Sequence, residues 1–376
     1  MTSVEQEILI YCTLLRPDLG QQQRIGQLMG GVKDRNLLID TAIKEGLVSM
    51  LYKSLLNAGA LDTLDIPQKE RLQSLYYQVL VHNLRLIYDL KEILHELNRR
   101  EVPVVLLQGI ILLQQIYHDV GLRPMTDIDL WVREVDYPDF VEILGNKGYQ
   151  RDPLYPNTFR KGPTILDVHT HILWADRIKT RTFLLAKSQD YIYHQTRVID
   201  FEGESARSLG TYDQVLYLCL HALKHNVERL MWLVDIKGLV AHWEGSDWKA
   251  LMDRATEWGQ EKSLAYILSL LSHVFGFHPP PDACQLPGRE GFNLLERKAL
   301  KQRVRKGALP RWAPLLLFSP ANGLKNRASF IFETLFPRPE ILRQIFEDSP
   351  DLKVWQLYCM RILQLLGKVK MCRKGL

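Results

Sequence analysis

Two aspartates, Asp127 and Asp129, stand two positions apart between apolar residues in the stretch RPMTDIDLWV. Ile128, Leu130 and Val132 alternate with them at period two, which is the pattern of a half-buried strand. Both carboxylates therefore lie on the same face of that strand, roughly 7 Å apart. Two such charges repel each other unless water or a cation screens them, so this strand either borders solvent or binds a metal.

A third carboxylate follows in the segment TILDVHTHIL, which alternates as another strand. Period two predicts that Asp167, His169 and His171 share one face of it. If the two strands are neighbours in a sheet, Asp167 converges with the first two aspartates. Three carboxylates supply the oxygen ligands that Mg²⁺ prefers, and this ion commonly joins carboxylates to substrate phosphates. Two such ions would polarise a phosphoryl group and lower the pKa of an attacking hydroxyl.

The elements that position these residues form a small sheet between helical segments. Residues 1–100 carry apolar residues at helical spacing. The run VPVVLLQG predicts a buried strand that ends in a turn at Gly109, and a helix follows it. Helical spacing returns from about residue 211. We predict an α+β fold with three domains: an N-terminal helical segment (1–100), a core with a small mixed β-sheet (101–210) and a C-terminal helical segment (211–376).

The composition excludes disorder and does not single out a nucleic-acid binder. Of 376 residues, 46% are hydrophobic and 24% are charged, which is typical of a folded globular chain. The formal net charge is +5. This mild basic excess suits an anionic ligand but falls short of the dense basic surface of a dedicated nucleic-acid binder.

The cysteines and the hydropathy of the sequence bear on where in the cell the protein is expected. Five cysteines are scattered along the chain without a CxxC pair, so neither a disulfide framework nor a zinc knuckle is indicated. The N-terminal residues lack the pattern of a signal peptide, and no run of roughly 18 apolar residues predicts a transmembrane segment. We expect a soluble protein of the reducing cytoplasm.

The order of these motifs along the chain resembles that of a known protein superfamily. A strand, a glycine, a helix, an Asp-x-Asp strand and a later Asp-bearing strand resemble the DNA polymerase β superfamily of nucleotidyltransferases. More narrowly, LLQGIILLQQIYHDVGLRPMTDIDLWV, GYQ, DVHTHI and LCLHALKHNVERLMWLVDI look like the bacterial uncharacterised nucleotidyltransferases. The resemblance implies that a nucleoside triphosphate donates a nucleoside monophosphate to an acceptor hydroxyl and that pyrophosphate leaves, with Mg²⁺ or Mn²⁺ as cofactor. It leaves open the base of the triphosphate and whether the acceptor is a small molecule, a peptide or protein, or an RNA end.

The resemblance also implies roles for individual residues. Three of them would bind metal and act in catalysis, the last also as the base for the acceptor hydroxyl: Asp127, Asp129 and Asp167. Four would contact the nucleotide: Gln108, Gly109, Arg123 and Thr126. His169 would contact the metal-binding carboxylates without binding the metal itself. Gln108 stands where relatives often have Lys, and Ile110 stands where they have Gly or Ser, so this end of the site departs from the family pattern.

Two other functions fit parts of the same pattern. A nucleotide-binding or scaffold protein could keep the fold without catalysis. DVHTH is also similar to the DxHxH motif of amidohydrolase-type metalloenzymes, in which His169 and His171 would bind zinc. Retention of all three carboxylates argues against the first alternative, and helices on both flanks argue against the second because that fold needs repeated βα units.

Overall fold

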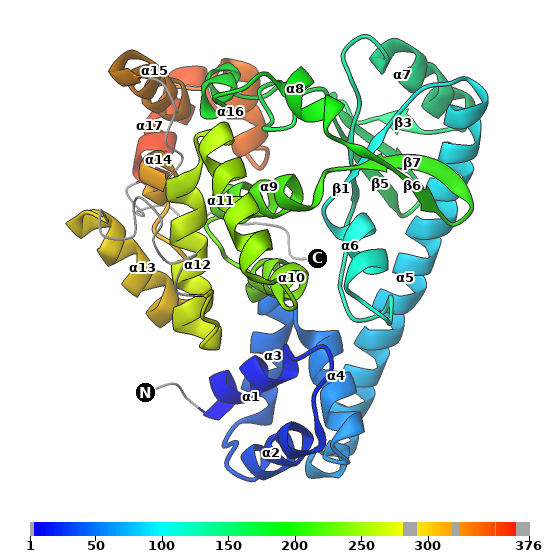
Figure 1. Ribbon diagram of the computed structural model, residues 1–376, viewed down its shortest axis with the longest axis vertical. Helices are drawn as coiled ribbons and strands as arrows, with labels where there is room; N and C mark the ends of the chain where they lie inside the picture. The colour runs from blue at the N-terminus through cyan, green and yellow to red at the C-terminus, as the bar shows by residue number, and fades with distance from the viewer. Residues whose placement is uncertain (1–3, 281–291, 318–322, 350, 366–376) are drawn as a thin grey trace.

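The computed structural model describes residues 4–280, 292–317, 323–349 and 351–365. Within these ranges the chain forms a mixed sheet that helices from both ends of the sequence surround (Figure 1). The predicted α+β fold is confirmed. All described strands fall between residues 105 and 208, whereas the division into three domains remains a prediction.

The sheet has seven strands in the order β3-β4-β5-β2-β1-β7-β6. Their bounds are β1 (Val105–Leu107), β2 (Ile128–Trp131), β3 (Gln150–Arg151), β4 (Thr158–Lys161), β5 (Thr164–His169), β6 (Arg197–Phe201) and β7 (Glu204–Ser208). The central strand β2 runs parallel to β5 and antiparallel to β1. β1 in turn runs parallel to β7, and the remaining neighbours are antiparallel. The two strands with predicted carboxylates are therefore direct neighbours.

The helices before the sheet are α1 (Val4–Cys12), α2 (Leu19–Met29), α3 (Arg35–Glu45), α4 (Val48–Asn57) and α5 (Ile66–Arg99), with the short 3-10 helix η1 (Leu61–Thr63) between the last two. Gly46 ends α3 with a φ of 75°, a left-handed conformation that glycine adopts without strain. An Asp65 capping box begins α5. This helix of 34 residues runs along one side of the molecule from the N-terminal helices to the sheet (Figure 1).

Helices within and after the sheet complete the fold. Those between strands are α6 (Gly109–Gln115), α7 (Tyr137–Asn146), η2 (Lys179–Leu184) and α8 (Gln189–His194). Those after it are α9 (Thr211–Lys224), α10 (Leu230–Val240), α11 (Gly245–Trp258), α12 (Glu261–Phe275), α13 (Leu294–Lys306), α14 (Ala313–Leu317), α15 (Gly323–Leu335), α16 (Pro339–Ile345) and α17 (Val354–Leu365). α15 packs on η2, so the C-terminal helices fold back onto the segment that follows β5.

One buried cluster connects these parts. It extends from Ile8 in α1 through Leu130 in β2 to Phe330 in α15. A smaller cluster, with Leu342 and Leu357 at its centre, joins α16 to α17. Among the described helices, none combines the length and apolar character that are needed to span a lipid bilayer.

One strand is shorter than predicted. β5 ends at His169, and the His171 carbonyl then accepts a hydrogen bond from the Trp174 amide within a turn. His171 therefore does not continue the strand face of Asp167 and His169. The alternation in the sequence continues past the last paired residue because half-buried turn residues can also be apolar, and pairing with β2 ends at Trp131.

Candidate active site

Asp129 and Asp167 lie directly opposite each other in the parallel ladder between β2 and β5. His169 Nε2 is 3.3 Å from Asp129 Oδ1 and 3.5 Å from Asp167 Oδ2. One ligand atom from each of these three residues lies within 4.8 Å of the others. Two carboxylates and an imidazole at this spacing are compatible with binding of a metal ion.

His169 is enclosed by the fold. Burial lowers its pKa, but Asp167 and Asp129 outweigh burial, so the net shift is upward. Its Nδ1 atom is buried without a hydrogen-bond partner in the described part of the chain. The imidazole therefore takes its orientation from the two carboxylates and from the edge-on ring of Trp174. Protonation of this imidazole is favoured by both aspartates.

Asp127 lies two residues before Asp129, directly before the first residue of β2. Burial raises its pKa to about 7, and Asp129 and Asp167 add to the shift. The Thr126 hydroxyl donates a hydrogen bond of 3.0 Å to Asp127 Oδ1, which opposes the shift. The raised pKa of this carboxyl group therefore reflects its burial first and the two neighbouring carboxylates second.

We expect Asp127 to make the metal-free protein less stable as pH rises. Its folded pKa of about 7 exceeds the ordinary value of 3.8, so the folded state keeps a proton that the unfolded state has lost. The resulting stabilisation is fully present below pH 4 and disappears as pH rises through 7. Between pH 5 and pH 8, wild type should lose about 1 to 3 kcal/mol relative to Asp127→Asn.

Urea unfolding at the two pH values, in the presence of chelator, measures this difference. Asp253→Asn is the matched control, because Asp253 is exposed in the middle of α11. If the gap between wild type and Asp127→Asn is the same at both pH values, the pKa of Asp127 is not raised in the folded protein.

A cavity of about 590 Å³ opens beside the carboxylates. Asp127, Asp167 and His169 lie in its wall together with Thr126. Tyr155 and Asn157 come from the loop before β4, and Thr158 and Arg160 come from β4 itself. Arg177 and Arg338 are further basic residues of the wall. The opposite wall comes from α16, through Glu340, Ile341 and Gln344. The cavity thus joins acidic and basic groups, as a site for a metal ion and phosphates requires.

The turn between β1 and α6 lies next to the carboxylates but does not open into the cavity. Leu107 pairs with Asp129, so Gln108 and Gly109 follow at the same end of the sheet. Gln108 has a φ of 52°, a strained backbone conformation, and its side-chain amide donates to the Tyr217 hydroxyl at 3.3 Å. A Cβ added at Gly109 would overlap the guanidinium of Arg123. Neither turn residue lines the cavity.

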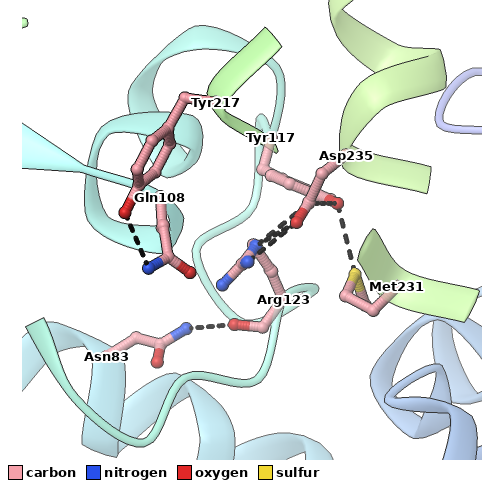
Figure 2. A network of polar contacts seen from close by, with 7 residues as sticks. All are labelled: Asn83, Gln108, Tyr117, Arg123, Tyr217, Met231 and Asp235. Carbon is pink, nitrogen blue, oxygen red and sulfur yellow. Dashed lines mark hydrogen bonds and ion pairs between the residues drawn. The ribbon is translucent and has the colours of Figure 1, made fainter. Parts of the chain in front are cut away.

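Arg123 lies behind this turn, where Figure 2 shows it facing Asp235. Its Nη2 donates to Asp235 Oδ2 at 2.7 Å and its Nε donates to Oδ1 at 3.0 Å. The Tyr117 hydroxyl donates to the same carboxylate, and the Asn83 amide donates to the Arg123 carbonyl. Arg123 is 6% exposed. In the structure this arginine therefore has a buried carboxylate as its partner, and its contact with a phosphate stays a prediction.

Within the described part of the chain, the histidines outside the carboxylate group belong to no further metal-compatible group. His171 Nδ1 accepts the Leu173 amide at 3.1 Å, and burial lowers the pKa of His171 to about 4. On α9, the rings of His221 and His225 are 4.7 Å apart and pack against Trp232. The metal-compatible group among the described residues contains one histidine, whereas the DxHxH alternative requires both His169 and His171.

Several residues near the site were not predicted. Tyr217 and Lys224 come from α9, and Arg338 and Gln344 come from the region of α16. For Lys224, the stretch HALKH left two interpretations open, a helical face near the nucleotide or ordinary packing. α16 carries no signal in the sequence, because its place over the cavity depends on long-range packing.

The structure thus combines a mixed sheet, two aspartates paired across its parallel strands β2 and β5, and a cavity beside them. The family model described as uncharacterised nucleotidyltransferase matches residues 32–276. The chain belongs to this nucleotidyltransferase family, as the sequence motifs predicted. No curated protein and no solved structure matches the chain.

Proposed function

We propose that the protein transfers a nucleoside monophosphate from a nucleoside triphosphate to an acceptor hydroxyl and releases pyrophosphate, with Mg²⁺ or Mn²⁺ as cofactor. The observation that carries the proposal is the direct pairing of Asp129 with Asp167 on neighbouring strands, beside a cavity that Asp127 also lines. Family membership supports the general reaction.

The residues present fit a divalent cation. Asp127, Asp129 and Asp167 offer the oxygen donors that suit Mg²⁺ and Mn²⁺. The raised pKa of Asp127 supports this fit, because repulsion from Asp129 and Asp167 contributes to it in addition to burial. We assign His169 the role of holding the carboxylates, since imidazole is a less typical ligand for these ions than carboxylate. The chemistry that a bound divalent ion supplies is polarisation of the phosphoryl group and a lower pKa for the acceptor hydroxyl.

The chain's own residues then have separate tasks. Asp167 is 35% exposed in its side chain and faces the cavity, so it takes the proton of the acceptor hydroxyl. The acceptor oxygen forms a bond to the α-phosphorus as the bond to the pyrophosphate oxygen breaks. Thr126 is the one predicted nucleotide contact that lines the cavity. Gln108, Gly109 and Arg123 instead maintain the shape of the adjacent turn in this proposal.

We expect Mg²⁺ or Mn²⁺ to raise the affinity for triphosphate, because carboxylates and phosphates repel each other unless they share a cation. Calorimetric titration with ATP, GTP, CTP and UTP, with and without Mg²⁺, measures the effect and identifies the base. Equal binding in excess chelator would count against the proposed site. Metal-dependent binding without pyrophosphate release, over a wide panel of acceptors, would favour the non-catalytic alternative.

The compartment is a separate inference. Cys12 and Cys219 are buried free thiols and Cys359 is an exposed one. An exposed free thiol is stable against oxidation in a reducing compartment, which supports our proposal of a cytoplasmic protein.

A further inference from the structure

A second cavity, of about 500 Å³, adjoins the one that contains the carboxylates. Five basic side chains line it: Arg177, Arg181, Lys224, Arg311 and Arg361. Glu228 is the single acidic residue among the described residues of its wall. We call this space the basic chamber. Its positive charges exceed its negative ones, and all five basic residues are half-buried.

The surrounding protein opposes these charges. Burial lowers the pKa of Arg181 to about 10, and Arg177 adds to the shift. Burial likewise lowers the pKa of Arg361 to about 10, with Arg311 as the second cause. A lowered arginine pKa means that the charged form gains too little from nearby anions to offset its lost hydration. An anion in the chamber would restore that balance.

Two acidic groups near the chamber, Asp176 and Glu333, differ in their partners. Asp176 and Glu333 each favour the charge on Arg181. The two Glu333 oxygens, however, accept the backbone amides of Lys179 and Thr180 at 2.9 Å and 2.8 Å, so this carboxylate mainly anchors η2. The Arg361 Nε atom is buried without a hydrogen-bond partner among the described residues. The chamber therefore keeps donors for a ligand.

The chamber connects with the carboxylate site. Tyr155, Arg177 and Gln344 line both cavities. Burial and Arg181 lower the pKa of Lys224 to about 7. Asp167 and Asp129 act in the opposite direction, so this lysine interacts electrostatically with the chamber and with the carboxylates. A ligand that fills the chamber can thus extend toward Asp167 along this shared wall.

The position of the chamber favours the acceptor over the triphosphate. One part of its wall comes from the segment after β5, the strand that carries Asp167, and another part comes from the C-terminal end of α9. Tyr155 and residues between 311 and 365 form the rest of the wall. Lys224, at that end of α9, interacts more strongly with Asp167 than with Asp129. The chamber therefore lies on the side of the proposed base.

We propose that the basic chamber binds a phosphate group of the acceptor, so that the acceptor is a phosphorylated small molecule or a phosphorylated terminus. The assignment to the acceptor rests on the proposed nucleotidyl transfer, whereas anion binding by the chamber does not. A volume of about 500 Å³ is typical of a site for a small ligand. Guanidinium groups suit a phosphate because they donate pairs of parallel hydrogen bonds.

The first experiment measures binding of inorganic phosphate to the metal-free protein by thermal shift, with sodium chloride at matched ionic strength as reference. Wild type should be stabilised in a saturable manner. Arg181→Gln and Arg361→Gln should each bind phosphate about tenfold to a hundredfold more weakly, the range expected for a charged hydrogen bond. Arg71→Gln is the matched control, because Arg71 is an exposed arginine of α5 that pairs with Asp40. Equal phosphate binding by wild type and the two chamber variants overturns the proposal.

Folding of the variants is checked without phosphate. Arg181→Gln should melt at or above the wild-type temperature, because it relieves repulsion with Arg177. If it does not fold, Arg181→Lys replaces it, since lysine keeps the charge but loses the paired hydrogen bonds. That variant should bind phosphate more weakly than wild type; unchanged affinity overturns the proposal.

The second experiment separates acceptor from triphosphate. Wild type saturated with nucleoside triphosphate and Mg²⁺ should still bind inorganic phosphate, and Arg181→Gln should keep its triphosphate affinity within about twofold. If triphosphate affinity instead falls in proportion to phosphate affinity, the chamber holds the triphosphate and the acceptor assignment is wrong. Neither readout uses turnover, so failure of the proposed reaction would be seen separately.

Discussion

Asp129→Asn is expected to abolish metal-dependent pyrophosphate release while it leaves the metal-free fold intact or slightly more stable. Asp129 and Asp167 are direct partners in the ladder, and neighbouring strands are only about 4.8 Å apart. Removal of one charge relieves repulsion between them. The same change removes a proposed metal ligand from the centre of the site, so the polarisation that drives transfer is lost.

Asp167→Asn should give a different result. It should retain more metal binding than Asp129→Asn but slow the chemical step by about 10² to 10⁴-fold, the usual contribution of a general base. Melting temperature and pyrophosphate release, each with and without Mg²⁺, distinguish the two variants. Asp253→Asn again controls for loss of an exposed carboxylate. If Mg²⁺ stabilises wild type and Asp129→Asn equally, the proposed metal site is wrong.

The local elements of the site were readable from the sequence because they follow from period-two alternation. Ile128 and Leu130 are fully buried and Asp129 faces the other way, as the alternation in DIDLW predicts. The resemblance to nucleotidyltransferases added the order of the motifs, and the family match confirms it. Local pattern and family pattern thus agree on the position of the carboxylates.

The register between β2 and β5 could not be predicted from the sequence. That Asp129 lies opposite Asp167 depends on a register between two strands separated by the whole of α7 and a hairpin. The strands β6 and β7 were missed altogether, although β7 extends the sheet beside β1. Their alternating residues are mostly exposed or half-buried, so the hydrophobic contrast that marks β2 is weak there.

Side-chain partners were still harder to predict. An arginine just before an Asp-x-Asp strand is well placed for a phosphate on sequence position alone. In the structure, Arg123 turns toward Asp235, a residue 112 positions later on α10. The chain folds α10 against the loop before β2, and no local pattern encodes that contact.

Arg123→Ala is therefore expected to act on folding more than on triphosphate binding. Asp235 is fully buried, and three short contacts tie its carboxylate to the Arg123 guanidinium. Burial opposes the charge on Arg123, but Asp235 more than compensates and raises its pKa. Without the arginine, a buried carboxylate keeps only the Tyr117 hydroxyl as a hydrogen-bond donor in the described network. The loss of one partner from such a buried pair costs about 3 to 5 kcal/mol.

Urea unfolding of Arg123→Ala measures this cost, and Arg133→Ala provides the comparison. Arg133 pairs with Asp136 but is 38% exposed in its side chain, so its loss should cost about 1 kcal/mol or less. Adding Asp235→Asn to Arg123→Ala should restore part of the stability, because it removes the unpaired buried charge. A phosphate-binding role predicts the reverse pattern: unchanged stability, weaker triphosphate binding by about 1.5 to 3 kcal/mol, and no recovery in the double variant. That outcome would return Arg123 to the nucleotide site and require the Arg123–Asp235 pair to open when triphosphate binds.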